Sequence, residues 1–314
     1  MATAVVTGAT GFVGSHLVDC LLERDYSVRV VVRRTSDLRW LEGRPVDRLE
    51  ADLSAPVSFP PCDVFFHVAG VIRARSWGEF LAGNRDAACR AIEGARAERF
   101  VHVSSLAAAG PGEGVDESAP CRPISLYGKS KWEGEREVWR RRGRIPVTVI
   151  RPPVVYGPRD FGLYDMFRTV RWGLRPEIGA GMVLSLVHVR DLVQGMVRAA
   201  ECPAAANEIF FLANPRPLAM PEVLDAMGRA LGRRTLRVRI PDRVVRFLGA
   251  VVEDGGRFLG RRPMFTRDKA LDMTQRAWSC SAEKARRILG WEASVPLGRG
   301  MAETVEWYRN HGLL

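Results

Sequence analysis

A glycine-rich segment near the amino terminus constrains the fold of this chain more than any other feature. Gly8, Gly11 and Gly14 follow the apolar run 4–6 and precede an apolar helical pattern over residues 12–22. Glycines remove side chains where a strand turns into a helix, so backbone N–H groups and the helix N-terminus can meet a pyrophosphate. Glycine triplets also occur in plain tight turns. Here, a second strand-like run at 28–32 completes a context that predicts a dinucleotide-binding loop.

The size and composition of the chain predict a globular protein. Its 314 residues, 46% of them hydrophobic, suffice for one large domain or two closely joined ones with a full core. The six cysteines lack metal-ligand spacing, and no signal peptide or run of about 18 apolar residues is present. We therefore expect free thiols, no metal and a cytoplasmic location. The net charge is +11, but the arginines are scattered, so we expect no nucleic acid partner.

Strand-like and helical segments alternate through the first half of the chain. The strand-like segments are apolar without alternating in polarity, which is typical of a parallel sheet covered on both faces. They lie at 4–7, 28–32, 48–50, 64–68, 100–103 and 147–150. This pattern predicts an α/β fold, with a doubly wound parallel Rossmann sheet and a smaller C-terminal substrate-binding lobe.

The alternation breaks after Arg151-Pro152-Pro153, where proline and glycine become frequent. We assign residues 1–157 to the dinucleotide-binding domain and expect 186–213 to return to it as a further helix and strand. The segments 158–185 and 214–314 form the expected substrate-binding lobe, with helices over 220–231, 281–289 and 298–311.

Tyr127 and Lys131 lie four residues apart, on one face of a predicted helix. A phenol with a pKa of about 10 is a poor proton carrier at neutral pH, and a nearby ammonium lowers that pKa. Such a pair also arises by chance on helix surfaces. Together with the glycine loop, and with Ser104 and Ser105 at the carboxyl end of strand 100–103, it predicts an acid/base site in which a hydroxyl holds a carbonyl oxygen.

With these features the chain resembles the extended branch of the short-chain dehydrogenase/reductase superfamily, which includes sugar-nucleotide epimerases, dihydroflavonol reductases and 3β-hydroxysteroid dehydrogenases. The resemblance implies that Ser105 polarises the substrate oxygen, Tyr127 transfers the proton, and Lys131 binds the nicotinamide ribose and lowers the tyrosine pKa. Ser105 is assigned rather than Ser104 because the family's hydroxyl stands five residues before a glycine, here Gly110. The matching segments are 7–14, 52–53, 66–69, 84, 103–105, 127 with 131, 151–158, 187–189 and 289–291.

The resemblance also implies a nicotinamide dinucleotide cofactor and a homodimer paired through the helix of Tyr127. Asp52 and Leu53 would flank the adenine, and Ala69 and Gly70 would lie along the cofactor. The expected cofactor-binding residues are Gly8, Thr10, Gly11, Phe12, Val13, Gly14, Arg33, Arg34, Ser36, Asp52, Leu53, Ala69, Gly70, Asn84, Pro152 and Val154.

The residues after the second strand bear on the choice between NADP and NAD. An acidic residue there would hydrogen-bond the adenosine 2′-hydroxyl and repel a 2′-phosphate, but this chain has Arg33-Arg34-Thr35-Ser36. A guanidinium can bind a phosphate bidentately. Arginine is abundant throughout the chain, so NAD stays an alternative to the NADP that we expect.

Departures from the family pattern narrow the activity. Epimerases usually bind the substrate diphosphate with an Arg-Asp pair where this chain has Leu184 and Ser185, and dehydratases carry Asp-Glu where it has Leu106 and Ala107. We expect an NADP(H)-dependent oxidoreductase that interconverts a ketone and a secondary alcohol on a largely hydrophobic small molecule. Its expected pocket residues are Val71, Ile72, Trp77, Phe161, Tyr164 and Met182. An NAD-dependent sugar or sugar-nucleotide 4-epimerase and a non-catalytic nucleotide-sensing protein are the alternatives.

Two further features have ordinary structural explanations. His67 and His188 lack a third ligand at useful spacing, so we expect them to pack in the core. The apolar stretch 244–252 is flanked by Arg237, Arg239 and Arg261-Arg262. It could form a lid or a membrane-surface helix, but we expect it to pack in the core of the second lobe, without stable membrane insertion.

Overall fold

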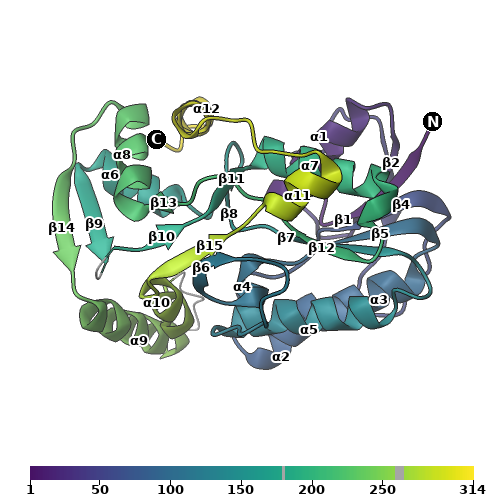
Figure 1. Ribbon diagram of the computed structural model, residues 1–314, viewed down its shortest axis with the longest axis horizontal. Coiled ribbons are helices and arrows are strands. Elements are labelled where there is room, and N and C mark those ends of the chain that lie inside the picture. Colours follow the sequence, from purple (N-terminus) through teal and green to yellow (C-terminus); the bar gives the residue numbers. More distant parts are fainter. Residues whose placement is uncertain (179–180, 259–264) are drawn as a thin grey trace.

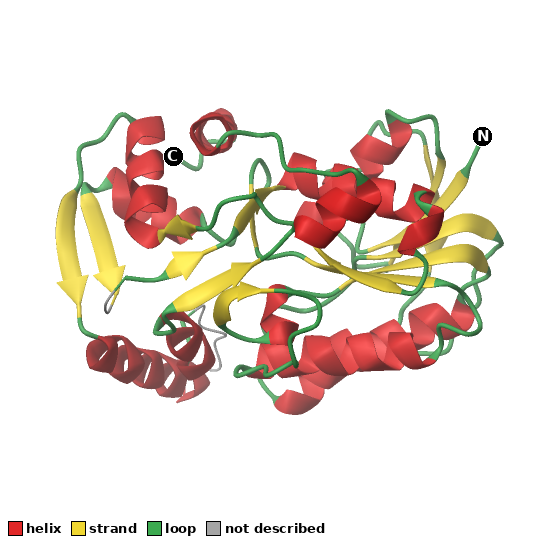
Figure 2. Cartoon of the chain, viewed as in Figure 1, coloured by secondary structure: helices red, strands yellow, loops and turns green. Residues whose placement is uncertain are grey.

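The computed structural model describes residues 1–178, 181–258 and 265–314, and its centre is a parallel sheet with helices on both faces (Figures 1 and 2). Within these residues the sheet has seven strands in the order β12-β7-β5-β4-β1-β2-β3. The strands are β1 (Thr3–Thr7), β2 (Ser27–Val32), β3 (Val46–Glu50), β4 (Cys62–His67), β5 (Ala97–Val103), β7 (Val147–Arg151) and β12 (Glu208–Phe211). The strand order reverses between β1 and β4, where open α/β sheets bind ligands at the carboxyl edge. The predicted doubly wound α/β fold is confirmed.

The alternation of side chains along each strand builds one core on each face of the sheet. Ala4 and Val6 of β1 join a hydrophobic cluster with α1 (Phe12–Leu22) and α7 (Val189–Glu201). Val5 points to the opposite face, where it joins α3 (Ala87–Gly94) and α5 (Leu126–Arg140). Because both faces are covered, the central strands are apolar on both sides.

Some predicted strands begin earlier than the apolar pattern indicates. The strand expected at 100–103 begins at Ala97, and the one expected at 48–50 begins at Val46. Their first residues include the exposed Glu98 and Asp47, whose side chains lie outside the core. In β5 the apolar pattern therefore detects only the buried part of the strand, whereas β3 is exposed over most of its length.

The second lobe lies beside the carboxyl ends of the central strands (Figure 1). Its four-stranded sheet has the order β13-β10-β15-β6, so β6 (Gly112–Val115) from the first half of the chain completes it. The other strands are β10 (Val183–Leu184), β13 (Leu218–Ala219) and β15 (Ala277–Cys280), with the parallel pairs β8 (Val154–Tyr156) and β11 (Leu186–His188), and β9 (Leu174–Ile178) and β14 (Leu236–Ile240). The remaining helices are α2 (Trp77–Phe80), η1 (Leu81–Asp86), α4 (Leu106–Ala109), α6 (Tyr164–Arg171), η2 (Pro203–Ala205), α8 (Met220–Leu231), α9 (Asp242–Phe258), α10 (Arg267–Met273), α11 (Glu283–Leu289) and α12 (Leu297–Asn310).

The apolar stretch 244–252 lies on α9, and the expectation that it packs in the core is wrong for most of it. Val245 is 3% exposed, whereas Phe247 and Val251 are 66% and 51% exposed. A Cβ on Gly249 would lie 2.7 Å from the Ala270 side chain, so the small residues of α9 face α10 and the larger apolar residues face outward. Arg261 and Arg262 lie outside the described residues. None of the helices in the described ranges is long and apolar enough to cross a membrane.

Candidate active site

The glycine loop joins β1 to α1 at the carboxyl edge of the sheet. Gly8 has a φ of +72°, and a Cβ there would lie 2.6 Å from the Ala69 nitrogen. A Cβ on Gly14 would lie 2.1 Å from the Gly8 carbonyl oxygen, so neither position accommodates a side chain. The N-cap of α1, Gly11, offers no side-chain hydrogen bond to the first turn. The loop therefore leaves backbone N–H groups at the start of α1 free of side chains, and such groups bind the pyrophosphate of a dinucleotide.

Arg33 and Arg34 follow β2 directly, and both are exposed. The backbone N–H of Arg33 donates to Ser36 Oγ at 2.9 Å, which shapes the turn. The hydrogen bond from the Ser54 N–H lowers the pKa of Asp52, and the charge of Arg33 lowers it further. Arg33, Ser36 and Asp52 therefore lie together at the end of β2, at one end of the candidate cofactor site.

The loop after β4 lies close to Lys131. A Cβ on Gly70 would lie 2.9 Å from Asn84 Oδ1 and 3.4 Å from Lys131 Nζ. The buried Asn84 amide donates to the Val71 carbonyl (2.9 Å) and to Ser130 Oγ (2.8 Å), and its oxygen accepts from the Val71 N–H (2.9 Å). The Asn84 side chain is therefore hydrogen-bonded within the protein, and its bonds to the Val71 backbone hold the loop that follows Gly70.

Ser104 and Ser105 follow β5 and have different surroundings. The Ser104 hydroxyl is buried and has no hydrogen-bond partner in the described part of the chain. Ser105 is the N-cap of α4, where its hydroxyl accepts from the Ala107 N–H at 3.1 Å. The same side chain lowers the pKa of Tyr127, so it lies close to the phenol. The structure thus brings Ser105, rather than Ser104, to the phenol.

Tyr127 is held by the start of α5. The N-cap Ser125 accepts from the Gly128 N–H at 3.3 Å. A Cβ on Gly128 would lie 2.4 Å from the Ala107 carbonyl oxygen, so the first turn of α5 packs directly against α4. This close approach sets Tyr127 beside Ser105.

Lys131 lies one turn further along α5, and its side chain is buried. The ammonium donates to the Val103 carbonyl at 2.6 Å. Burial lowers the pKa of Lys131 to about 8, although Glu135 acts in the opposite direction.

The pKa of Tyr127 moves opposite to the direction expected from the sequence. Burial raises it, the nearby Ser105 side chain lowers it, and the charge of Asp272 raises it. Lys131 was expected to lower this pKa, but its ammonium is directed to the Val103 carbonyl. The hydroxyl of Ser105, and not Lys131, is the group that favours the phenolate in this arrangement.

Asp272 is a site residue that the sequence analysis missed. It belongs to α10, which covers the first turn of α5: the Leu126 N–H donates to Asp268 Oδ2 at 2.6 Å, and the Ser125 side chain acts on the pKa of Asp272. Burial raises the pKa of Asp272 to about 6, and its Oδ1 has no hydrogen-bond partner among the described residues. No sequence motif marks Asp272, because only the packing of α10 on α5 brings it to Tyr127.

The expected pocket residues separate into groups. Val71, Ile72 and Trp77 follow Gly70 in the loop that leads into α2, and Ile72 is 65% exposed. Met182 precedes β10, and its carbonyl accepts from the Met220 N–H at 2.8 Å.

Phe161 and Tyr164 instead pack against α12 and the C-terminus. The Phe161 ring meets Trp307 edge-on with centroids 6.0 Å apart, and the Tyr164 hydroxyl donates to the Leu313 carbonyl at 2.7 Å. These contacts assign both residues to the aromatic packing of the second lobe, which corrects their expected place in the pocket.

The two histidines singled out in the sequence lie apart and have structural partners. His67 Nδ1 lies 2.8 Å from Thr7 Oγ1, and burial lowers the pKa of His67 to about 3. His188 is the N-cap of α7, where Nδ1 accepts from the Arg190 N–H at 3.3 Å. Within residues 1–178, 181–258 and 265–314, no group of three His, Cys, Asp or Glu side chains could hold a metal ion.

Comparisons with known proteins show the family of the chain. The sequence model of the NAD dependent epimerase/dehydratase family matches residues 4–213. A ceramide reductase of Caulobacter vibrioides is 30% identical, over 98% of this chain and 95% of the relative. A 4-hydroxy-2-methyl-3-oxo-4-farnesyl-3,4-dihydroquinoline-1-oxide ketoreductase of Stigmatella aurantiaca is also 30% identical, over 94% of this chain and 93% of the relative.

A solved structure has the same fold over the whole chain. The crystal structure of gox2253 has a TM-score of 0.80 and 26% sequence identity, with all of both chains covered. The family match extends over most of the chain, and reductases are among its full-length relatives. The chain belongs to the NAD-dependent epimerase/dehydratase family, and it is an NAD(P)-dependent oxidoreductase of the extended short-chain dehydrogenase/reductase type.

Proposed function

We propose that this protein is an NADP(H)-dependent reductase or dehydrogenase that interconverts a ketone and a secondary alcohol on a largely hydrophobic small molecule. The observation that carries the proposal is the grouping of Ser105, Tyr127 and Lys131 beside the glycine-rich loops at the carboxyl edge of the sheet.

Each of these side chains has a role that its position supports. Ser105 holds the substrate oxygen, and Tyr127 gives or takes the proton at that oxygen. Lys131 binds the nicotinamide ribose next to the loop of Gly70, and the bound cofactor supplies or accepts the hydride. The phenol is protonated at neutral pH, because its ordinary pKa is about 10 and burial raises it, so Tyr127 holds the proton that the substrate oxygen takes up on reduction.

Arg33 and Arg34 support NADP as the cofactor. Both guanidinium groups are exposed at the end of β2, where the adenosine 2′-phosphate of NADP would lie. Ser36 and Asp52 lie in the same region and would complete this end of the site.

We infer a hydrophobic substrate because the chain lacks the charged pair with which epimerases bind a diphosphate. Leu184 and Ser185, which replace the diphosphate-binding pair of epimerases, are both buried, and Ser185 forms hydrogen bonds with the backbone of Cys280. A diphosphate would therefore lose hydration there without a charged partner. The names of the two reductases above, with ceramide and a farnesyl-bearing quinoline as substrates, point in the same direction. The family model also includes epimerases, so a sugar-nucleotide 4-epimerase is the alternative.

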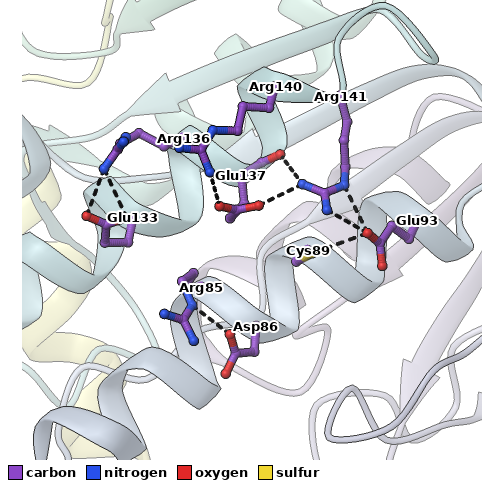
Figure 3. A network of polar contacts seen from close by, with 9 residues as sticks. All are labelled: Arg85, Asp86, Cys89, Glu93, Glu133, Arg136, Glu137, Arg140 and Arg141. Atoms are coloured by element: carbon purple, nitrogen blue, oxygen red, sulfur yellow. Dashed lines mark hydrogen bonds and ion pairs between the residues drawn. The ribbon is translucent and has the colours of Figure 1, made fainter.

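A homodimer through α5 and α3, which the resemblance implies, is part of this proposal. Figure 3 shows an ion pair between these helices, in which Arg141 at the end of α5 donates to Glu93 of α3 (2.6 Å), and a second pair along α5, from Arg141 to Glu137 (2.8 Å). If α5 and α3 form the dimer interface, these charged side chains are already paired within each subunit before the subunits meet.

A spectrophotometric screen tests the proposed reaction. NADPH oxidation is followed with a panel of apolar ketones, and the same ketones are then offered to Tyr127→Phe. We expect kcat to fall by about 10²–10⁴-fold with nucleotide binding nearly unchanged, because only the proton-transferring hydroxyl is removed. Tyr164→Phe is the matched control, since it removes a hydroxyl bonded to Leu313. A Tyr127→Phe enzyme that keeps more than about a tenth of kcat would exclude the proton-transfer role.

A further inference from the structure

One face of α9 carries an apolar stripe that points away from the protein. Val244, Phe247, Leu248, Val251 and Val252 follow the i, i+3, i+4, i+7, i+8 spacing of a single helix face, and they are between 39% and 66% exposed. Surface helices of globular proteins usually turn this stripe to the core. In α9 the stripe faces solvent, which marks it as an interaction surface.

The packing of α9 fixes this orientation. Val245 is buried, and a Cβ on Gly249 would lie 2.9 Å from the Thr266 carbonyl oxygen and 2.7 Å from the Ala270 side chain. The Gly249 side of α9 therefore packs directly against α10. The helix cannot rotate about its axis to bury the stripe without displacing α10. In Figure 2 α9 lies at an outer corner of the molecule, with α10 beside it.

The chain around the stripe is strongly basic. Between residues 233 and 252 it carries six arginines and a single acidic residue, Asp242. The acidic residues Glu253 and Asp254 follow towards the end of α9, where both form ion pairs with Arg267 of α10. Arg239 at the end of β14 and Arg243 in the first turn of α9 are exposed, and neither has an ion pair within the described residues. An apolar stripe bordered by unpaired guanidinium groups matches the boundary between acyl chains and anionic headgroups.

We propose that α9 docks on an anionic membrane surface, with Phe247, Leu248 and Val251 in the headgroup and acyl boundary and Arg239 and Arg243 against lipid phosphates. A second copy of the chain fits this face less well, because a symmetric contact would bring two surfaces of the same positive charge together. The proposal goes beyond the proposed reaction and does not depend on it.

Docking here would also bring the candidate active site near the lipid. The residues of α10 behind α9 contact the first turn of α5, through Asp268 and Leu126, directly before Tyr127.

Vesicle binding of the full chain tests the docking without reference to activity. Vesicles of phosphatidylcholine with phosphatidylglycerol are compared with phosphatidylcholine alone by co-sedimentation, at low and high salt. We expect binding to the anionic vesicles that weakens at high salt. Phe247→Ser/Val251→Ser and Arg239→Glu/Arg243→Glu should each reduce the partition coefficient by about tenfold or more.

The control is Arg286→Glu/Arg287→Glu on α11, which makes the same change of charge on exposed residues far from α9 in Figure 1. It should keep binding near that of the unmodified chain, and thermal unfolding verifies that every variant is folded. Absence of binding to anionic vesicles, or equal losses in the control, overturns the proposal. So does a dimer in sedimentation velocity that Phe247→Ser/Val251→Ser dissociates, because a second copy would then cover the stripe.

Discussion

Two neighbouring arginine side chains differ in how free their charges are. Arg34 Nε lies 3.7 Å from Glu50 Oε1, whereas Arg33 is exposed at the end of β2 near Asp52. We expect Arg33→Ala to raise KM for NADPH by about tenfold or more, since a hydrogen bond to a charged group contributes about 1.5–3 kcal/mol. KM for NADH should change little, and Arg34→Ala should have a smaller effect. Steady-state kinetics with NADPH and NADH measure these changes in KM. An unmodified enzyme that prefers NADH would refute the assignment of Arg33 to the 2′-phosphate of NADP.

Asp272 predicts how stability changes with pH. Burial raises its pKa from 3.8 to about 6, Lys269 opposes this, Asp268 adds to it, and Ser125 opposes it. The folded state thus binds this proton more tightly than the unfolded chain does. The resulting stabilisation is fully present below a pH of about 4 and is lost as the pH rises through about 6. Asp272→Asn should therefore raise Tm at alkaline pH and have little effect in acid.

Thermal unfolding at the two pH values measures this difference, with the exposed Asp165→Asn as control. An equal change in Tm at both pH values would mean that the substitution acts through packing and not through charge.

Sequence patterns predicted side chains that share a local motif and missed those that meet through tertiary packing. Tyr127 and Lys131 are four residues apart on one helix, so their shared face followed from the helix period. Asp272 comes from a helix remote in the chain, and Phe161 was assigned to a pocket although it packs on Trp307. A lone aspartate or phenylalanine has no spacing that reveals its partner.

Helix α5 positions Tyr127 through one close contact, between Gly128 in its first turn and the backbone of α4. Gly128→Ala would place a methyl group 2.4 Å from the Ala107 carbonyl oxygen, so the first turn of α5 must move away from α4. We expect a loss of about 1–3 kcal/mol in the free energy of unfolding and a fall in kcat, because Tyr127 shifts from Ser105. Gly143→Ala is the control, since its Cβ would meet no atom within 4 Å. Denaturant unfolding and steady-state kinetics should separate the two variants, and equal behaviour would exclude the positioning role.

Helix limits were predictable where the chain carries its own start and stop signals. The helix expected at 220–231 is found at Met220–Leu231, with Pro221 in its first turn and Gly232 in the left-handed conformation at its end. For α9 the apolar stretch 244–252 was expected in the core, but most of its large side chains are exposed. Periodicity shows that a stripe exists, whereas the contact through Gly249 decides which way it points.

The two lobes are tied together across the candidate site. β6 from the first half pairs with β15 from the second, and the Leu126 N–H donates to Asp268 of α10. The simple division of the chain at residue 157 could not include β6 in the second sheet, since its pairing with β15 joins segments far apart in the sequence. A substrate between the lobes therefore meets groups from both.

The surfaces of the two lobes favour a hydrophobic substrate over a sugar nucleotide. Leu184 and Ser185 are buried and cannot pair with a diphosphate, while Ile72 and Trp77 expose apolar surface after Gly70. Covering apolar surface contributes about 25 cal/mol per Å², whereas a diphosphate would give up strong hydration without a cation in return. We expect calorimetric titration of the NADP-loaded protein to show binding of hydrophobic ketones and none of UDP or UDP-glucose. Micromolar binding of UDP, with no response to any ketone, would contradict the reductase and favour the epimerase.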